Sequence, residues 1–223
     1  MANIDWGPLS RPWSQHLTAV ITSSADAQRA GAPPEWCALL GPGCIDRVRT
    51  AWAAAAHALP LFNDYLGRQL DDVAIGTGPA GYVLLYRFRD WVDDGDAFLP
   101  GVMVAGLPMT APQQEKIERM FGRLPEGLRA VWSRHSFVQL KNGSMLVRPE
   151  DAKLLQTPSH DYLAFVDSWS DLPTCLQRQH GASAWTDDVV VFAPGSSVAR
   201  SGVSPTVDAL LVDWPTLRWP PDL

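Results

Sequence analysis

Residues 71–88 read DDVAIGTGPAGYVLLYRF, and this stretch decides between two fold classes. Within it, Gly76–Gly81 matches the G-x-G-x-x-G pattern, which in a dinucleotide-binding fold leads from a strand into a helix. Here the following residues, Tyr82–Phe88, are β-rich, and no alternation of strands and helices surrounds them. We therefore predict that the glycine-rich segment connects two antiparallel strands, and we expect no cofactor. A nucleotide-binding turn is the less favoured alternative.

Helical patterns precede this stretch and further strands follow it. A short helix is expected from Pro33-Pro34 to Leu40, before the break at Gly41-Pro42-Gly43. A second helix carries apolar residues at steps of three and four, and Pro60 is expected to end or kink it. These apolar residues are Ile45, Val48, Trp52, Ala55 and Leu59. The expected strands of this half are Val73–Ile75, Tyr82–Phe88 and Phe98–Val104.

The second half repeats the order of helices before strands. Thr110 and Gln113 have the spacing of a capping box, which predicts a helix ended by Gly122. Its expected apolar face consists of Ile117, Met120 and Phe121. A second helix should begin at Leu124-Pro125-Glu126 and bury Leu128, Val131 and Trp132.

The remaining elements are strands and one last helix. Asn142-Gly143 predicts a hairpin turn between residues 137–140 and 144–147. Further strands are expected at Tyr162–Val166 and Val189–Phe192. Ser204-Pro205 can cap a helix whose apolar residues are Val207, Leu210, Leu211 and Trp214.

These patterns predict an α+β protein with helices packed on mainly antiparallel sheets. The shared order raises the hypothesis of two similar halves, each with helices before strands. Strand character ends and the capping box begins near Gly106-Leu107-Pro108. We therefore divide the chain into an N-terminal α+β region, residues 1–107, and a second α+β domain, residues 108–223.

Composition limits the classes of function. The net charge of −6 disfavours direct binding of nucleic acid, and a basic protein partner suits it better. The ten tryptophans are expected mostly in the cores. Neither a signal peptide nor a membrane helix is recognisable, so we expect a cytoplasmic protein without membrane association. Its three cysteines are then expected as reduced thiols.

A cluster of carboxylates is the candidate partner-binding site. Asp90, Asp93, Asp94 and Asp96 surround Gly95 and are called the acidic turn below. A solvated turn without a specific contact is the favoured interpretation, and binding of a basic protein surface or of a hard cation stays open. The spacing differs from that of an EF-hand loop.

No catalytic or metal-binding constellation is recognisable in the sequence. The five histidines do not pair at metal-ligand spacing, and Cys175 with His180 supplies too few ligands for zinc. The motifs G-x-S-x-G and S-x-x-K of serine hydrolases, H-E-x-x-H of zinc proteases and the Walker phosphate-binding loop are missing. We predict no catalytic, metal or cofactor residues, although distant residues can still form a triad in a fold.

Residues 120–155 read MFGRLPEGLRAVWSRHSFVQLKNGSMLVRPEDAKLL. This stretch resembles the opening of the GAD-like and SUKH-type immunity domains of bacterial polymorphic toxin systems. The matching features are the helix before Leu124-Pro125, the helix with Trp132, the strand at Phe137, the Asn142-Gly143 turn and the strand reaching Pro149. The resemblance implies a non-catalytic protein that binds a cognate toxin, often a nuclease, and it carries over no catalytic residues.

The leading hypothesis is therefore an immunity protein that occludes the active site of a toxin delivered by a type VI or related contact-dependent secretion system. One alternative is a small cytoplasmic enzyme, such as a hydrolase, with a distributed site. Another is an adaptor protein unrelated to toxins.

Overall fold

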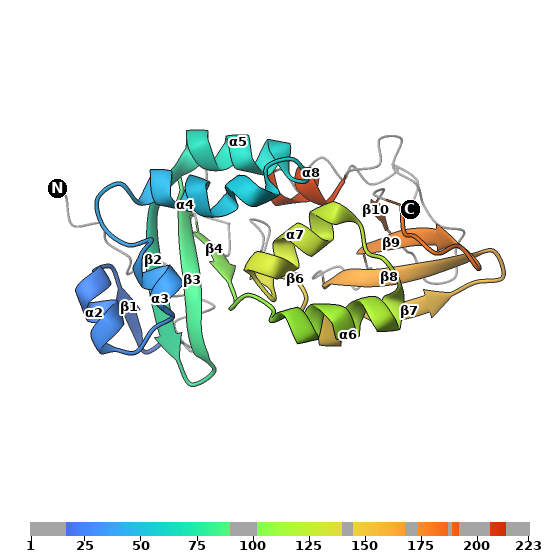
Figure 1. Ribbon diagram of the computed structural model, residues 1–223, viewed down its shortest axis with the longest axis horizontal. Coiled ribbons are helices and arrows are strands. Elements are labelled where there is room, and N and C mark those ends of the chain that lie inside the picture. The colour runs from blue at the N-terminus through green and yellow to red at the C-terminus, as the bar shows by residue number, and fades with distance from the viewer. Residues whose placement is uncertain are drawn as a thin grey trace, which may run out of the picture.

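The computed structural model describes residues 17–89, 102–139, 145–167, 174–186, 189–191 and 206–212 (Figure 1). The helices are α2 (Ser24–Arg29), α3 (Pro34–Cys37), α4 (Cys44–Trp52), α5 (Pro60–Gln69), α6 (Ala111–Phe121), α7 (Glu126–Arg134) and α8 (Val207–Val212), with 3-10 turns η2 (Ala53–Ala55) and η3 (Pro149–Asp151). The strands are β1 (Ala19–Ile21), β2 (Leu70–Gly78), β3 (Gly81–Phe88), β4 (Val102–Ala105), β5 (Val138–Gln139), β6 (Met145–Leu146), β7 (Lys153–Gln156), β8 (His160–Asp167), β9 (Thr174–Gln179) and β10 (Val189–Val191).

The glycine-rich segment is part of a β-hairpin, as predicted. Strands β2 and β3 are antiparallel, and the last residue of β2, Gly78, is paired with Gly81. Gly81 has a φ of 105°, a backbone conformation that residues with a Cβ rarely adopt. The chain therefore reverses through Pro79-Ala80, and a strand follows where a dinucleotide-binding fold would have a helix.

Antiparallel pairing continues through all the named strands. The hydrogen-bonded order is β1-β2-β3-β4-β5-β6-β8-β9-β10, and β7 pairs with β8. The two-residue strands β5 and β6 connect the long strands of the first half with those of the second. Together with the helices, this pairing confirms the predicted α+β class with mainly antiparallel sheets.

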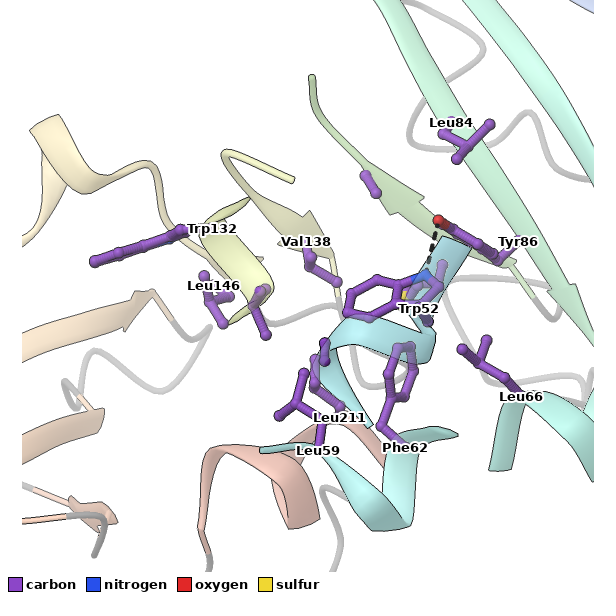
Figure 2. Packing of buried hydrophobic residues seen from close by; sticks show 14 of the residues in the cluster. Trp52, Leu59, Phe62, Leu66, Leu84, Tyr86, Trp132, Val138, Leu146 and Leu211 are labelled. Atoms are coloured by element: carbon purple, nitrogen blue, oxygen red, sulfur yellow. Dashed lines mark hydrogen bonds between the residues drawn. The ribbon is translucent and has the colours of Figure 1, made fainter. Parts of the chain in front are cut away.

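Side chains alternate between the two faces of the sheet, as the two-residue period of a strand requires. In β3, Leu84 and Tyr86 belong to the main hydrophobic cluster, whereas Leu85 between them belongs to a smaller cluster. The main cluster also contains the buried residues of α4, α5, α6, α7 and α8. The helices therefore pack on one face of the sheet, and Figure 2 shows Trp52, Phe62 and Tyr86 meeting there.

The helical stripe of the first half is largely confirmed. Val48, Trp52, Ala55 and Leu59 are buried, and Ile45 is partly buried against them. The prediction that Pro60 ends or kinks this helix was wrong. Helix α4 ends earlier, at Trp52, and Pro60 begins α5, because the fixed φ and missing amide of proline fit a first helical position.

In the second half, α6 and α7 occupy the predicted positions. The side-chain oxygen of Gln113 accepts from the Thr110 amide at 2.8 Å, and Gly122 follows the end of α6 with a φ of 83°. Ile117 and Phe121 are buried, but Met120 is 56% exposed, so its place on the apolar face was wrong. Helix α6 thus presents a narrower apolar stripe than predicted.

The predicted core of α7 is confirmed. Leu128, Val131 and Trp132 are all buried, and the indole Nε1 of Trp132 donates to the carbonyl of Val147 at 3.2 Å. Strands β5 and β6 pair as the hairpin prediction requires, while the Asn142-Gly143 turn lies outside the described residues.

The main hydrophobic cluster extends across the expected boundary at residue 107. The carbonyl of Leu107 accepts from the Ser136 amide at 2.6 Å, and the Met109 amide donates to the Trp132 carbonyl at 3.1 Å. The division into residues 1–107 and 108–223 stays a prediction. Among the described residues, no helix has the length and apolarity needed to cross a bilayer.

Candidate functional site

The acidic turn, Asp90, Asp93, Asp94 and Asp96, lies outside the described residues, but the strands on either side of it are described. Strand β3 ends at Phe88 and β4 begins at Val102. Arg87 is paired with Val102 in the antiparallel ladder. The segment with the acidic turn therefore begins and ends at neighbouring strands.

Basic side chains near this segment contact another carboxylate. Arg87 and Arg89 are the basic residues between positions 71 and 96. Their Nε atoms lie 3.5 Å and 3.4 Å from the carboxylate of Asp71 on β2. Residues 90–101 contain no lysine or arginine, so this segment has no compensating charge of its own. The formal negative charge of the acidic turn is thus concentrated in one connection between two strands.

A buried chain of hydrogen bonds, which the sequence patterns did not reveal, joins Trp52, Tyr86, His135 and Gly106. Nδ1 of His135 lies 2.9 Å from the Gly106 carbonyl, which can only accept, so Nδ1 carries the proton. Nε2 then accepts from the hydroxyl of Tyr86 at 2.7 Å. The Tyr86 oxygen in turn accepts from Nε1 of Trp52 at 3.4 Å, the bond drawn in Figure 2.

Burial keeps the side chains of this hydrogen-bonded chain uncharged. It lowers the pKa of His135 to about 4 and raises the pKa of Tyr86 above its usual range. Both side chains are almost fully buried, His135 at 2% exposure and Tyr86 at 1%. These hydrogen bonds therefore join β3, α4 and the end of α7 and have a structural role. The side chains that form them are buried, so a substrate in solvent does not reach them.

A second polar cluster surrounds Asp161, a buried carboxylate on β8. Arg178 donates to it from Nε at 2.9 Å, Gln156 donates at 3.2 Å, and Nδ1 of His180 lies 3.2 Å away. Burial alone raises the pKa of Asp161, but these hydrogen bonds outweigh it and hold the pKa below its usual range. Asp161 therefore stays ionised and joins β7, β8 and the end of β9.

Arg178 also extends this cluster to α6. Its Nη1 donates to the Phe121 carbonyl at 2.9 Å, and Nε1 of Trp185 donates to the same carbonyl at 2.8 Å. The guanidinium lies over the Trp185 ring at 4.4 Å from its centroid. These contacts satisfy the last turn of α6, so the role of Asp161 and Arg178 is structural. His180, by contrast, exposes 61% of its side chain.

The cysteines do not form a reactive site. Cys37, Cys44 and Cys175 are all buried. Sγ of Cys44 lies 3.6 Å from the carboxylate of Asp72, and burial together with this negative charge raises the pKa of the thiol. Burial raises the pKa of Cys175 to about 12. The thiols of Cys44 and Cys175 are therefore protonated and poorly nucleophilic.

Metal-ligating side chains do not cluster in the part of the chain that the structure describes: it contains no group of three or more His, Cys, Asp or Glu placed to hold an ion. His57 and Glu126 form an exposed pair at 2.6 Å between the end of η2 and the start of α7. The four tryptophans within the described ranges, Trp36, Trp52, Trp132 and Trp185, are buried, as expected for core residues.

Comparison with known proteins gives no relative: no family model, curated protein or solved structure matches the chain.

Proposed function

We propose that the chain is a non-catalytic immunity protein that binds a cognate antibacterial toxin and occludes its active site. The observation that carries the proposal is the charge of the acidic turn. Asp90, Asp93, Asp94 and Asp96 lie in a chain of net charge −6, in a segment without a basic residue. A nuclease, whose active site attracts phosphates, is the toxin class that such a surface complements.

The surroundings of the turn support this role. The segment that contains it connects β3 and β4, which are paired strands, and binding residues often lie in loops that a scaffold of strands positions. Asp71 lies against the nearby Arg87 and Arg89, so these arginines already have a carboxylate partner. The proposed site is therefore a negatively charged segment of sequence between two paired strands.

The buried polar side chains form structural hydrogen bonds, which is consistent with a binding protein. His135 and Tyr86 serve one hydrogen-bonded chain, and Asp161 and Arg178 serve another. The order of α6, α7, β5 and β6 is also the order on which the resemblance to immunity domains rests. We place the protein in the cytoplasm, where an incoming toxin acts, with type VI secretion as the route of delivery.

The test uses a purified cognate toxin, sought first as the product of the gene adjacent to this one, with binding rates measured at two salt concentrations. The variant combines Asp93→Lys, Asp94→Lys and Asp96→Lys. We expect association to slow at least tenfold at low salt and the difference to shrink at high salt, because exposed charges act through steering that ions screen. Cells that express the toxin should survive with the wild-type protein and die with the variant.

The matched control combines Glu35→Lys, Glu115→Lys and Glu150→Lys, which makes the same change in net charge at exposed positions elsewhere. Both triple variants should melt close to the wild-type temperature, since exposed charges contribute little to stability. Equal slowing by both variants would show an effect of overall charge and would contradict a role of the turn. Wild-type protein that neither binds nor protects would leave the enzyme or the adaptor as the better hypothesis.

A further inference from the structure

Helix α8 is attached to α5 through one buried carboxylate. Asp208 of α8 is 5% exposed, and its two oxygens accept from the backbone amides of Leu61 and Phe62, both at 2.8 Å. These amides are in the first turn of α5, where helical residues have no partner within their own helix. Asp208 thus caps a helix that lies almost 150 residues earlier in the chain.

Helix α5 has no such cap of its own. Its N-cap residue is Leu59, whose side chain cannot accept, and Pro60 occupies the first helical position. A carboxylate at this end also interacts favourably with the helix dipole. Burial raises the pKa of Asp208 while the two amide hydrogen bonds oppose the rise. The beginning of α5 therefore depends on α8 for its hydrogen bonds.

Apolar contacts complete the attachment. Val207, Leu210 and Leu211 are each 3% exposed and belong to the main cluster. Figure 1 shows α8 beside the beginning of α5, and Figure 2 shows Leu211 next to Leu59 and Phe62. On the other side, α7 approaches α8 at Gly127, where a Cβ would lie 3.5 Å from Cβ of Val207, an ordinary contact.

Within the described residues, α8 covers six positions, Val207–Val212. A helical segment of this length is marginal in water by itself, since isolated helices below about 12 residues rarely persist. Its structure therefore depends on docking to α5 and α7. The described side chains that hold it are the carboxylate of Asp208 and four apolar side chains, the buried Val207, Leu210 and Leu211 and the partly buried Val212. The sheet pairing of β2 with β3 does not involve α8.

From these contacts we propose that α8 is a strap, which docks on α5 and α7 and releases from them as a unit while the sheet stays folded, and that the carboxylate of Asp208 controls its release. Release uncaps α5 and uncovers Leu59 and Phe62. This inference concerns the fold itself and does not depend on the proposed function.

Hydrogen exchange of the full-length protein, followed by mass spectrometry at low denaturant concentrations, tests the strap. In the wild-type protein, amides of α8 and of the first turn of α5 should exchange through an opening that costs less than the opening of β2 and β3. In Asp208→Asn, exchange in α8 and at Leu61 and Phe62 should be faster by about tenfold, the usual effect of losing a helix cap. Exchange in β2 and β3 should stay nearly unchanged.

Asp64→Asn is the matched control, because it removes a carboxylate from α5 that is exposed and lies 2.8 Å from Arg68 of the same helix. It should leave exchange in α8 unchanged. The strap is refuted if α8 of the wild-type protein opens only together with β2 and β3, or if Asp208→Asn behaves like Asp64→Asn. Should Asp208→Asn fail to fold, the comparison of α8 with β2 and β3 in the wild-type protein decides the matter by itself.

Discussion

The hydroxyl of Tyr86 lies 2.7 Å from Nε2 of His135, which is 49 residues later in the chain. This bond connects β3 with the residue that ends α7, in the interior of the main cluster. Since both partners are neutral and buried, the bond is sensitive to any change that charges or removes one of them.

Acid should weaken the fold through His135. Burial lowers its folded-state pKa to about 4 from the ordinary 6.5, so the unfolded chain binds the proton more readily. Its contribution to stability is complete above pH 6.5 and falls as the pH is lowered toward 4, by about 3 kcal/mol in total at 1.36 kcal/mol per pKa unit. Urea unfolding of the wild-type protein between pH 7 and pH 4 gives the total change in stability, of which the loss at His135 is one part.

The variant His135→Gln should lose less stability over this pH interval than the wild-type protein. His57→Gln makes the same substitution at an exposed histidine and serves as the control. Asp208, whose pKa is raised, acts in the opposite direction as the pH falls, but it does so equally in all three proteins. An identical pH dependence in His135→Gln and the wild type contradicts the assignment.

Removing the hydroxyl of Tyr86 should be costly. Tyr86→Phe leaves Nε2 of His135 and Nε1 of Trp52 without this partner inside the core, so we expect the free energy of unfolding to fall by about 1–3 kcal/mol. Tyr82→Phe removes a hydroxyl that donates to the Ala30 carbonyl at the surface, where water can replace it. Chemical denaturation should show the larger loss in Tyr86→Phe, and a reversed order counts against the buried chain.

Trp132 should be a main determinant of stability in the second half. It is 2% exposed and its indole donates to Val147, so Trp132→Ala should lower the free energy of unfolding by about 3–5 kcal/mol. Met120→Ala, at the 56% exposed position of α6, should change it by less than about 0.5 kcal/mol. Thermal and urea unfolding can compare the two. If the Trp132→Ala variant melted at the same temperature as the wild-type protein, the indole of Trp132 would have to be exposed.

Two glycines should respond oppositely to alanine. At Gly106 a Cβ would lie 2.4 Å from the Phe137 ring, so Gly106→Ala should destabilise the fold by about 1–3 kcal/mol. At Gly127, in α7, the nearest atom to a Cβ is Cδ2 of Leu59 at 3.4 Å, an ordinary contact. Gly127→Ala should therefore stabilise the helix by about 0.5–1 kcal/mol. Urea midpoints that shift in the same direction for both variants would disagree with this packing.

Local patterns were sufficient for several elements. The hairpin of β2 and β3 followed from a β-rich run after Gly81, and the buried face of α7 followed from the spacing of Leu128, Val131 and Trp132. Among the short elements, β10 and α8 were predicted but α2, β1, β7 and β9 were not, because three to six residues carry too little periodicity for a dependable prediction. The prediction that Met120 lies on the apolar face of α6 failed for a related reason. Residue spacing does not show how wide a face of the helix is covered by neighbouring elements.

The sequence by itself determined the α+β class, the hairpin in place of a nucleotide-binding turn, and the acidic turn as the candidate binding segment. Tertiary structure alone decided the polar pairs. His135 meets Tyr86, Asp161 meets Arg178, and Asp208 meets the start of α5. The physical reason is range: helix and strand periodicity acts between residues a few positions apart, whereas a buried hydrogen bond depends on which distant residues the folded core brings within about 3 Å of each other.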